Sequence, residues 1–496
     1  MTARELLIAW VLLTAALVIQ LLGTNQLDLF GHGLWLDETI TWLITNDRSF
    51  GHALAAVHGG VDTNPPTMYL LLWPVARMVG GLNEVGLHTV SFLSVTLALA
   101  GLYAICRRCF DPLPSALGAL VVGAHPTVLG QAYEARFYGA WLAATVWFAY
   151  GQVISGDSPQ RRATIGRCVL GVLAATIHWF GAIAVAMILF TDLILHRRPA
   201  QLLIRRALPG VCAAVVLLAC IPFYLGQRSG LTVPTWIDPL SLSDIKRELT
   251  QALGPMAIVF VVVAAFLARV IGWNDEAGKR EPHQEPRVML RELAPLASLL
   301  LFPVVIVIFS FVVQPALKER YIIVAIAPLA PLAAWLTARC GRIGLMLMLA
   351  GVFTIGAAEL VAQGQSIRGK EDEWHRVLEA IDSAPDPHRP LVFKRRHELY
   401  PLLRLRPQLL ERSAMLDFDG EPSAQITPLA QYERDMSRKV NRFYPQLRLA
   451  PIDELRKGGA IYVISPIQDQ FELGALLRAY FDVEPRAEWI YEVKPK

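Results

Sequence analysis

Two adjacent acidic residues, Asp37 and Glu38, are the first candidates for a chemical role. They lie in the segment GLWLDETITW, surrounded by aromatic and aliphatic residues. A carboxylate held against apolar side chains is expected to have a raised pKa and can then act as a general base. The alternative is structural, because an aspartate at this place is also typical of the N-cap of a helix. The local sequence leaves both interpretations open.

A second group of ionisable residues occurs in the segment QAYEARFYGAW, which contains Glu134, Arg136 and Tyr138. A guanidinium can hold a phosphate through two parallel N–H donors. The segment KERY supplies a second arginine with a tyrosine beside it, Arg320 and Tyr321. We therefore predict that both arginines, with the two tyrosines beside them, bind a phosphate group. The alternative for each arginine is a side chain that only extends toward lipid headgroups.

Four further residues are candidates for lining a substrate site. Asn64 precedes two prolines, which fix an extended entry into the segment that contains Tyr69. His58 and His178 lie at the ends of apolar segments. Taken alone, each of these histidines is more often a packed side chain than a functional one.

The composition indicates that these residues belong to a membrane protein. Of the 496 residues, 54% are hydrophobic and 18% are charged, whereas about a quarter of the residues of a soluble protein are charged. A disordered chain and a secreted disulfide scaffold are excluded. The formal net charge of +4 is too small to indicate a nucleic acid as partner. The six cysteines show no zinc-ligand spacing, and no metal-binding motif is predicted.

Eleven apolar segments are predicted to cross the membrane, which requires about 17–25 residues for each. They lie near 6–23, 87–106, 113–130, 139–154, 166–178, 180–196, 207–225, 254–272, 293–313, 321–338 and 343–359. Basic residues recur in every second connection, which the positive-inside rule places in the cytoplasm. The predicted fold is a polytopic α-helical membrane protein with about eleven spans and a cytoplasmic N-terminus. The candidate site residues then lie in or beside the outer connections.

The outer loop 24–86 contains an apolar segment, 66–80, that is too short to cross and includes a proline and an arginine. We place it as a helix in the membrane interface. After residue 360 charged residues return, and strand-like runs at 391–394, 460–465 and 488–493 alternate with helical stretches such as 468–481. We therefore predict a transmembrane domain at 1–360 and an extracytoplasmic α/β domain at 361–496, which is long enough to fold as a unit.

The predicted spans contain almost no charged residues, which gather instead at their outer ends. Pumps and ion-coupled transporters place ionisable groups in the middle of the membrane. The distribution therefore favours chemistry at the membrane surface. A flippase for polyprenyl-linked sugars would share the helices and the phosphate-binding cations, but it would not need a carboxylate in the first outer loop. A non-catalytic scaffold for the C-terminal domain would need neither eleven spans nor the ring of acidic and basic residues.

The order of five motifs resembles the GT-C glycosyltransferases. These motifs are WLDE, NPPTMY, YEARFY, ERY and EDEW, and they lie between residues 35 and 374. The nearest resemblance is to bacterial relatives of dolichyl-phosphate-mannose protein mannosyltransferases and of lipid A aminoarabinose transferases. Two positions depart from that pattern. Asn64 stands where relatives often have His or Lys, and the common E-A-R-P-Y is E-A-R-F-Y here.

The resemblance implies a multi-pass enzyme of the cell (inner) membrane. Its donor would be a polyprenyl phosphate sugar, and its acceptor an extracytoplasmic glycan, lipid or protein, usually with inversion at the sugar. Asp37 matches the catalytic aspartate of the first loop, while Glu134 and Arg136 match the acidic and basic positions of the second. Glu38 or Glu134 would orient the acceptor, or hold a divalent cation if one is used. No other cofactor is expected.

Overall fold

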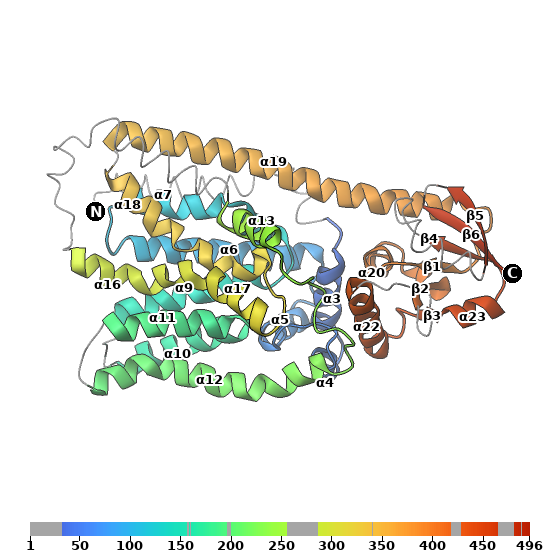
Figure 1. Cartoon of the computed structure of the whole chain (residues 1–496), viewed down its shortest axis with the longest axis horizontal. Helices are drawn as coiled ribbons and strands as arrows, with labels where there is room; N and C mark the ends of the chain where they lie inside the picture. Colours follow the sequence, from blue (N-terminus) through green and yellow to red (C-terminus); the bar gives the residue numbers. More distant parts are fainter. Residues whose placement is uncertain are drawn as a thin grey trace.

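The structure is a computed structural model, and it describes residues 32–155, 158, 160–195, 200–254, 286–339, 341–417, 428–464, 481–487 and 489–496. Most helices of the first part lie side by side along the long axis of the molecule and form a helical body (Figure 1). A smaller domain with a sheet lies at one end of this body, where the chain ends.

Several helices of the body are long and apolar enough to cross a membrane. Among the described residues four helical segments meet this test, at Glu84–Cys106, Leu203–Arg228, Arg291–Val312 and Glu319–Ala338. They correspond to α6 (Glu84–Cys106), α12 (Ala200–Arg228), α16 (Pro286–Ala297) with η1 (Ser298–Leu301) and α17 (Phe302–Val312), and η2 (Glu319–Ile326) with α18 (Leu329–Arg339). The chain is a polytopic helical membrane protein. The number of eleven spans stays a prediction, because segment 6–23 and nearly all of 254–272 lie outside the described residues.

The predicted division of the long apolar run 166–196 is confirmed. Helix α9 (Tyr138–Ser155) is followed by α10 (Arg161–Thr176), and the chain then turns at His178 and Trp179 into α11 (Gly181–Leu195). The turn brings His178 to the end of the helical body at which the outer loops lie.

The predicted span 113–130 is not one straight helix. It consists of α7 (Pro112–Gly123) and α8 (Pro126–Tyr133), which are bent by 70° to each other. The bend follows from Pro126, which has no N–H to continue the hydrogen bonds of α7. His125 begins the new helix, because its Nδ1 accepts a hydrogen bond of 3.2 Å from the Thr127 N–H. Helix α8 thereby directs the chain into the loop that contains Glu134 and Arg136.

The predicted span 321–338 also begins irregularly. Its first part is the 3₁₀ helix η2, with non-helical backbone angles at Ile322 (φ −115°, ψ 16°), before α18 begins. Long 3₁₀ stretches are uncommon, and within a helix they often mark a functional hinge. Here the stretch holds Arg320 and Tyr321 at the same end of the body as the second loop, which connects α8 to α9 and contains Glu134 and Arg136.

The first outer loop folds into three short helices, α3 (Leu36–Thr45), α4 (Phe50–His58) and α5 (Thr67–Met78). Helix α5 coincides with the segment that we predicted to lie in the membrane interface. It leaves Leu70, Leu71 and Met78 exposed, as expected for a helix that lies on a membrane. Its position at the membrane surface stays a prediction.

The C-terminal domain contains a six-stranded sheet with the strand order β3-β2-β1-β4-β6-β5. The strands are β1 (Leu391–Phe393), β2 (Ser413–Asp417), β3 (Leu449–Pro451), β4 (Ile461–Ile464), β5 (Phe481–Ala487) and β6 (Ile490–Pro495). Strands β1 to β4 pair in parallel, whereas β6 pairs antiparallel with β4 and β5.

The predicted α/β character of this domain is confirmed. The three strand-like runs in the sequence coincide with β1, β4 and β6, and β2, β3 and β5 were not predicted. The helices are α20 (Arg396–Leu399), α21 (Leu402–Leu405), η3 (Pro407–Arg412), α22 (Pro428–Phe443) and α23 (Ile452–Lys457). The helix expected at 468–481 lies outside the described residues, except for Phe481, which begins β5.

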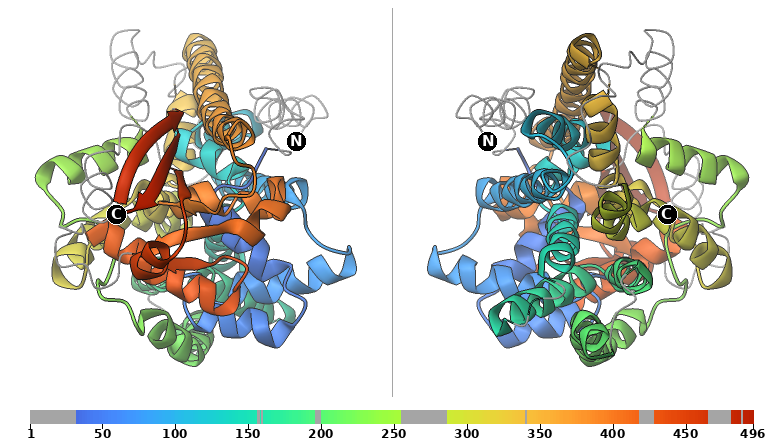
Figure 2. Two further views of the ribbon diagram at one scale, coloured as in Figure 1. Left: turned by 90° about the vertical axis from the view of Figure 1, so that its right-hand side faces the viewer. Right: turned by 90° about the vertical axis from the view of Figure 1, so that its left-hand side faces the viewer.

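The domain is joined to the helical body by α19 (Gly341–Asp382), so the predicted boundary at residue 360 falls inside one continuous helix. It also rests directly on the outer loops. The Arg404 guanidinium forms a double hydrogen bond with Glu84 (2.6 and 2.7 Å), and the Tyr444 hydroxyl donates to Asp47 (3.1 Å). Seen from its own side, the domain lies in front of the helical body (Figure 2).

Close packing between α7 and α18 depends on a glycine. A methyl group at Gly118 would lie 2.3 Å from the carbonyl oxygen of Ala330, whereas one at Gly166 would have no neighbour within 4 Å. Gly118→Ala should lower the stability by about 1–3 kcal/mol through overpacking. Gly166→Ala should leave it unchanged or slightly raised. Thermal unfolding of the detergent-solubilised protein measures both, and equal melting temperatures for the two variants would contradict this packing.

Candidate active site

The WLDE segment forms the first turn of α3. The residue before the helix is Trp35, and Asp37 is the second residue within it. The interpretation of Asp37 as the N-cap is therefore wrong. A carboxylate in the first turn interacts favourably with the helix dipole. The Asp37 side chain is 33% exposed and lines a cavity at the end of the helical body.

Glu38 points the other way and is buried. Its carboxylate accepts hydrogen bonds from the backbone N–H groups of Trp35 and Ala135, both at 2.6 Å, and lies 3.3 Å from His88 Nε2. Burial alone would raise the pKa of Glu38, but the interactions with His88 and the two N–H groups lower it to about 2. This is the opposite of the raised pKa expected from the sequence. Glu38 is an anchor between α3 and the second loop.

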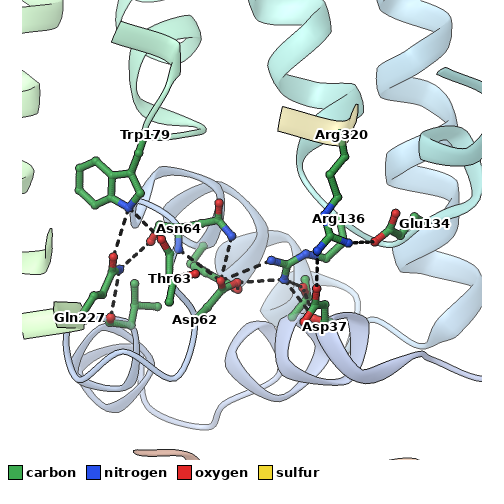
Figure 3. Close-up of polar contacts among 12 residues, drawn as sticks. Asp37, Asp62, Thr63, Asn64, Glu134, Arg136, Trp179, Gln227 and Arg320 are labelled. Carbon is green, nitrogen blue, oxygen red and sulfur yellow. Dashed lines mark hydrogen bonds and ion pairs between the residues drawn. The ribbon is translucent and has the colours of Figure 1, made fainter. Parts of the chain in front are cut away.

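Arg136 is buried and forms an ion pair with Asp62. Its Nη1 donates to Asp62 Oδ2 (3.0 Å), to Thr41 Oγ1 (2.9 Å) and to the carbonyl oxygen of Asp37 (3.0 Å), as Figure 3 shows in part. Burial alone would raise the pKa of Asp62, but the charge and hydrogen bond of Arg136 lower it. The guanidinium thus ties together the second loop, α3 and the segment around residue 62.

The segment 62–64 is held from both sides. Asp62 accepts hydrogen bonds from the Asn64 side chain (2.8 Å) and from the Tyr69 hydroxyl. On the other side, Gln227 at the end of α12 donates to the Asn64 carbonyl (2.7 Å), and the Trp179 indole donates to the Thr63 carbonyl (2.8 Å) (Figure 3). These contacts fix Asn64 at the cavity wall and bury Tyr69 behind it.

Arg320 lies between two carboxylates. Its Nη2 is 3.8 Å from Asp37 Oδ2, and its Nη1 is 3.8 Å from Glu134 Oε1 (Figure 3). Both separations are too long for hydrogen bonds. The guanidinium carbon also lies within 6 Å of the ring centres of Tyr138 (5.9 Å) and Tyr321 (5.6 Å). Arg320 is therefore held by charge and by aromatic rings, and within the described ranges no residue accepts a hydrogen bond from its guanidinium.

Two cavities meet at Trp35 and Arg320, which line both. The aspartate cavity has a volume of about 430 Å³, and its lining includes Asp37, Asn64, Arg136, Tyr138, His178, Arg228, Arg320, Tyr321, Arg396 and Glu433. The glutamate cavity has a volume of about 460 Å³, and its lining includes Glu38, Gln131, Glu134, Glu319, Glu359, Lys370, Glu371 and Trp374. The first is rich in arginine, and the second in carboxylates and amides.

The structure brings most of the predicted site residues to these cavities. Asp37, Asn64, Arg136, Tyr138, His178, Arg320 and Tyr321 line the aspartate cavity, and Glu38 and Glu134 line the glutamate cavity. Two predicted residues line neither. Tyr69 is buried against Phe137, with 5.3 Å between ring centres, and His58 packs edge-on against Phe223 (5.7 Å). The chemical roles of all these residues stay predictions.

One group of side chains has the composition of a metal site. Ligand atoms of His32, Glu38 and His88 all lie within 4.8 Å of one another. Within the described ranges this is the one such group of three or more potential ligands. The carboxylate of Glu38 accepts two backbone hydrogen bonds and lies 3.3 Å from His88 Nε2. The ring of His32 lies against that of His88, with 4.1 Å between ring centres, and both His32 and Glu38 line the glutamate cavity.

Four charged residues that line the aspartate cavity were not predicted from the sequence, namely Arg228, Arg396, Glu433 and Asp62, the partner of Arg136. Asp62 could have been found, because an arginine buried near an apolar helix end needs an anion close by, and Asp62 lies just before the two prolines. Arg396 and Glu433 come from the C-terminal domain. No local pattern in the sequence indicates that this domain folds back onto the first outer loop.

Removing one partner of the buried Arg136–Asp62 pair should be costly. Asp62→Asn leaves the guanidinium without its counter-charge and should lower the free energy of unfolding by about 3–5 kcal/mol. A matched control is Asp382→Asn, which removes an exposed ion pair with Arg406 and should cost at most about 1 kcal/mol. Thermal or chemical unfolding in detergent measures both, and similar losses would contradict a special role for the buried pair.

Comparison with known proteins gives a likeness of fold. No protein-family model and no curated protein matches the chain. ArnT from Cupriavidus metallidurans bound to undecaprenyl phosphate is 14% identical, with 99% of this chain and 98% of that chain covered and a TM-score of 0.56. In its apo state the same protein gives 14% identity, 97% coverage of both chains and a TM-score of 0.50.

An oligosaccharyltransferase from Archaeoglobus fulgidus is less similar, with 12% identity, coverage of 81% of this chain and 62% of that chain, and a TM-score of 0.45. The two ArnT comparisons extend over nearly the full length of both chains. At this level of identity they establish the fold alone. The chain has the fold of ArnT, a GT-C fold, as the order of its motifs predicted.

Proposed function

We propose that the chain is a membrane glycosyltransferase that moves a sugar from a polyprenyl phosphate donor to an acceptor hydroxyl on the extracytoplasmic face. The observation that carries this proposal is the pairing of Asp37 with Arg320 at the wall of one cavity, 3.8 Å apart. A carboxylate that can take a proton and a guanidinium that can bind a phosphate are the two groups that such a transfer requires. The GT-C fold supports it, since the ArnT structure that the chain resembles is bound to undecaprenyl phosphate.

The donor phosphate is best accommodated by Arg320 in the aspartate cavity, whose lining also includes Arg228. Arg136 also lines this cavity, but its two terminal nitrogens are already bonded to Asp62, Thr41 and the backbone of α3. Its part is therefore to hold Asp37 in place. Arg320 keeps donors for the phosphate, and the rings of Tyr138 and Tyr321 support its charge.

Groups at the cavity wall account for the proton transfer and for the stabilisation of the leaving group. Asp37 takes the proton of the acceptor hydroxyl as its oxygen forms a bond to the anomeric carbon. The bond from that carbon to the phosphate oxygen breaks on the opposite face, which inverts the configuration, and polyprenyl phosphate leaves. Negative charge grows on the departing phosphate, and a guanidinium already in place stabilises this charge more in the transition state than in the ground state.

The glutamate cavity suits the acceptor. Carboxylates outnumber cations in its lining, which also contains Trp35, Trp374 and the amide of Gln131. This composition favours a hydroxyl-rich group and repels a phosphate. Gln131 donates to Glu134 (2.6 Å), which positions that carboxylate to orient an acceptor hydroxyl. Because the Arg320 guanidinium already lies between Asp37 and Glu134, these carboxylates do not require a divalent cation to balance their charge.

The sidedness follows from the basic loops in the sequence. The site and the C-terminal domain lie on the extracytoplasmic side of the inner membrane, with the N-terminus in the cytoplasm. The polyprenyl tail then extends along the apolar helices from the aspartate cavity, whose lining includes Phe180, Tyr224 and Phe309.

Loss of the proposed base should abolish most of the transfer. With purified protein, a polyprenyl phosphate sugar and a membrane extract as acceptor source, Asp37→Asn should lower the rate of product formation by about 10²–10⁴-fold. Asp372→Asn, an exposed residue that lines neither cavity, should retain full activity. Mass spectrometry of the products measures the rates. Near-full activity of Asp37→Asn, or movement of intact donor across vesicles without any product, would contradict the enzyme and favour a flippase.

Loss of the proposed phosphate ligand should weaken binding of the lipid. Arg320→Gln should raise the Kd for undecaprenyl phosphate about tenfold or more, because a charge-assisted contact to phosphate is lost. The control Arg247→Gln removes an exposed arginine on α13 (Leu242–Leu253) that lines neither cavity and should leave the Kd unchanged. Binding to protein in nanodiscs measures this, and an unchanged Kd for Arg320→Gln would remove Arg320 from the phosphate site.

A further inference from the structure

The C-terminal domain supplies part of the wall of the aspartate cavity. Its helices α20 and α22 lie on the side of the sheet that faces the outer loops (Figure 1). Arg396 and His397 from α20, and Tyr432, Glu433 and Met436 from α22, line the cavity together with Asp37. Without this domain the cavity would be open on the side opposite the membrane helices.

The topology of the sheet identifies the edge of the domain that lines the aspartate cavity. The chain passes from β1 through β2 to β3 on one side and then returns to β4 on the other side of β1. In sheets of this kind, ligands bind beyond the carboxyl ends of the parallel strands, at the place where the strand order reverses. Arg396 and His397 follow the carboxyl end of β1 directly. The edge at which such domains usually bind ligands therefore faces Asp37.

Arg396 is held in the cavity wall with part of its hydrogen-bonding capacity unused. It is 5% exposed, and its Nη2 lies 3.6 Å from Glu433 Oε1. Its Nε has no hydrogen-bond partner within the described part of the chain. Burial acts to lower the pKa of Arg396, but Glu433 and the nearby Asp37 contribute to raising it. A buried donor that lacks a partner costs free energy, so a role for it is expected.

The domain is also fixed relative to Asp37. The ring of His397 stacks on that of Trp35, two residues before Asp37, with 5.3 Å between ring centres. In addition, Asp435 on α22 accepts hydrogen bonds from the backbone N–H (2.7 Å) and the hydroxyl (2.6 Å) of Thr232. Arg396 and Glu433 thus lie at the cavity on a domain that is held in place by these contacts with Trp35 and Thr232.

We propose that Arg396 and Glu433 recognise the sugar of the lipid-linked donor, and that this sugar is uncharged. This inference rests on the proposed function. The two charges balance each other, so the pair offers an N–H donor next to a carboxylate acceptor, which matches adjacent hydroxyl groups of a sugar ring. A neutral pair gives no net attraction to a second phosphate or a sugar carboxylate, so it does not compensate the cost of taking such a charge out of water. The arginines on the membrane side of the cavity remain for the single phosphate of the donor.

The test compares binding of lipids with and without a sugar to the full chain in nanodiscs. The probes are undecaprenyl phosphate, the same lipid phosphate carrying glucose, mannose or arabinose, and one carrying glucuronic acid. We expect at least one neutral sugar to improve the Kd of the wild-type chain about tenfold over undecaprenyl phosphate. Arg396→Gln and Glu433→Gln should each remove most of this gain, while the Kd for undecaprenyl phosphate stays within about twofold.

The matched control is Arg395→Gln, the same substitution at the preceding residue, which does not line the cavity and should keep the gain. The inference is overturned if the two variants weaken all lipids equally, if they keep the gain, if glucuronic acid binds best, or if no sugar improves binding to the wild-type chain. The proposed function, in contrast, is overturned if the wild-type chain binds undecaprenyl phosphate as weakly as the Arg320→Gln variant does. Melting temperatures establish that each variant is folded.

Discussion

The buried ion pair between Arg136 and Asp62 is the constraint on which the site depends. One guanidinium bonds to the carboxylate of Asp62, to Thr41 and to the backbone of Asp37. These groups come from the first outer loop, while Arg136 comes from the second. Because the pair is buried, its charges cannot be separated without a large loss of solvation and Coulomb energy. The pair therefore fixes the start of α3, and with it the direction of the Asp37 side chain.

The charged residues of the site divide into those that hold the structure and those that face the cavities. Glu38 and Arg136 form hydrogen bonds with the backbone and with neighbouring side chains. Asp37 and Arg320 are partly exposed and are 3.8 Å apart. The C-terminal domain closes the same space from outside, since it brings Arg396 and Glu433 to the cavity wall. In the motif WLDE, Glu38 holds the structure, while its neighbour Asp37 faces a cavity. In the motif EAR, Arg136 holds the structure, while Glu134 lines the glutamate cavity.

Much of this arrangement follows from local sequence. Apolar length predicts the helices of the body, and the segment WLDE predicts an acidic residue at the end of that body. The bend at Pro126 and the 3₁₀ start of the Arg320 segment were missed, because apolar length gives no information on where a helix breaks. The pKa of Glu38 was predicted in the wrong direction, since its hydrogen bonds come from His88 and Ala135, far along the chain. The contribution of Arg396 depends on long-range docking, which no local pattern encodes.

The central claim is that a lipid phosphate binds beside Asp37 through Arg320. A cryo-electron microscopy structure of the full chain in nanodiscs with undecaprenyl phosphate tests this most directly. The account predicts density for the phosphate in the aspartate cavity, in contact with the Arg320 guanidinium. Phosphate density in the glutamate cavity, or at any place that Arg320 does not reach, would contradict it.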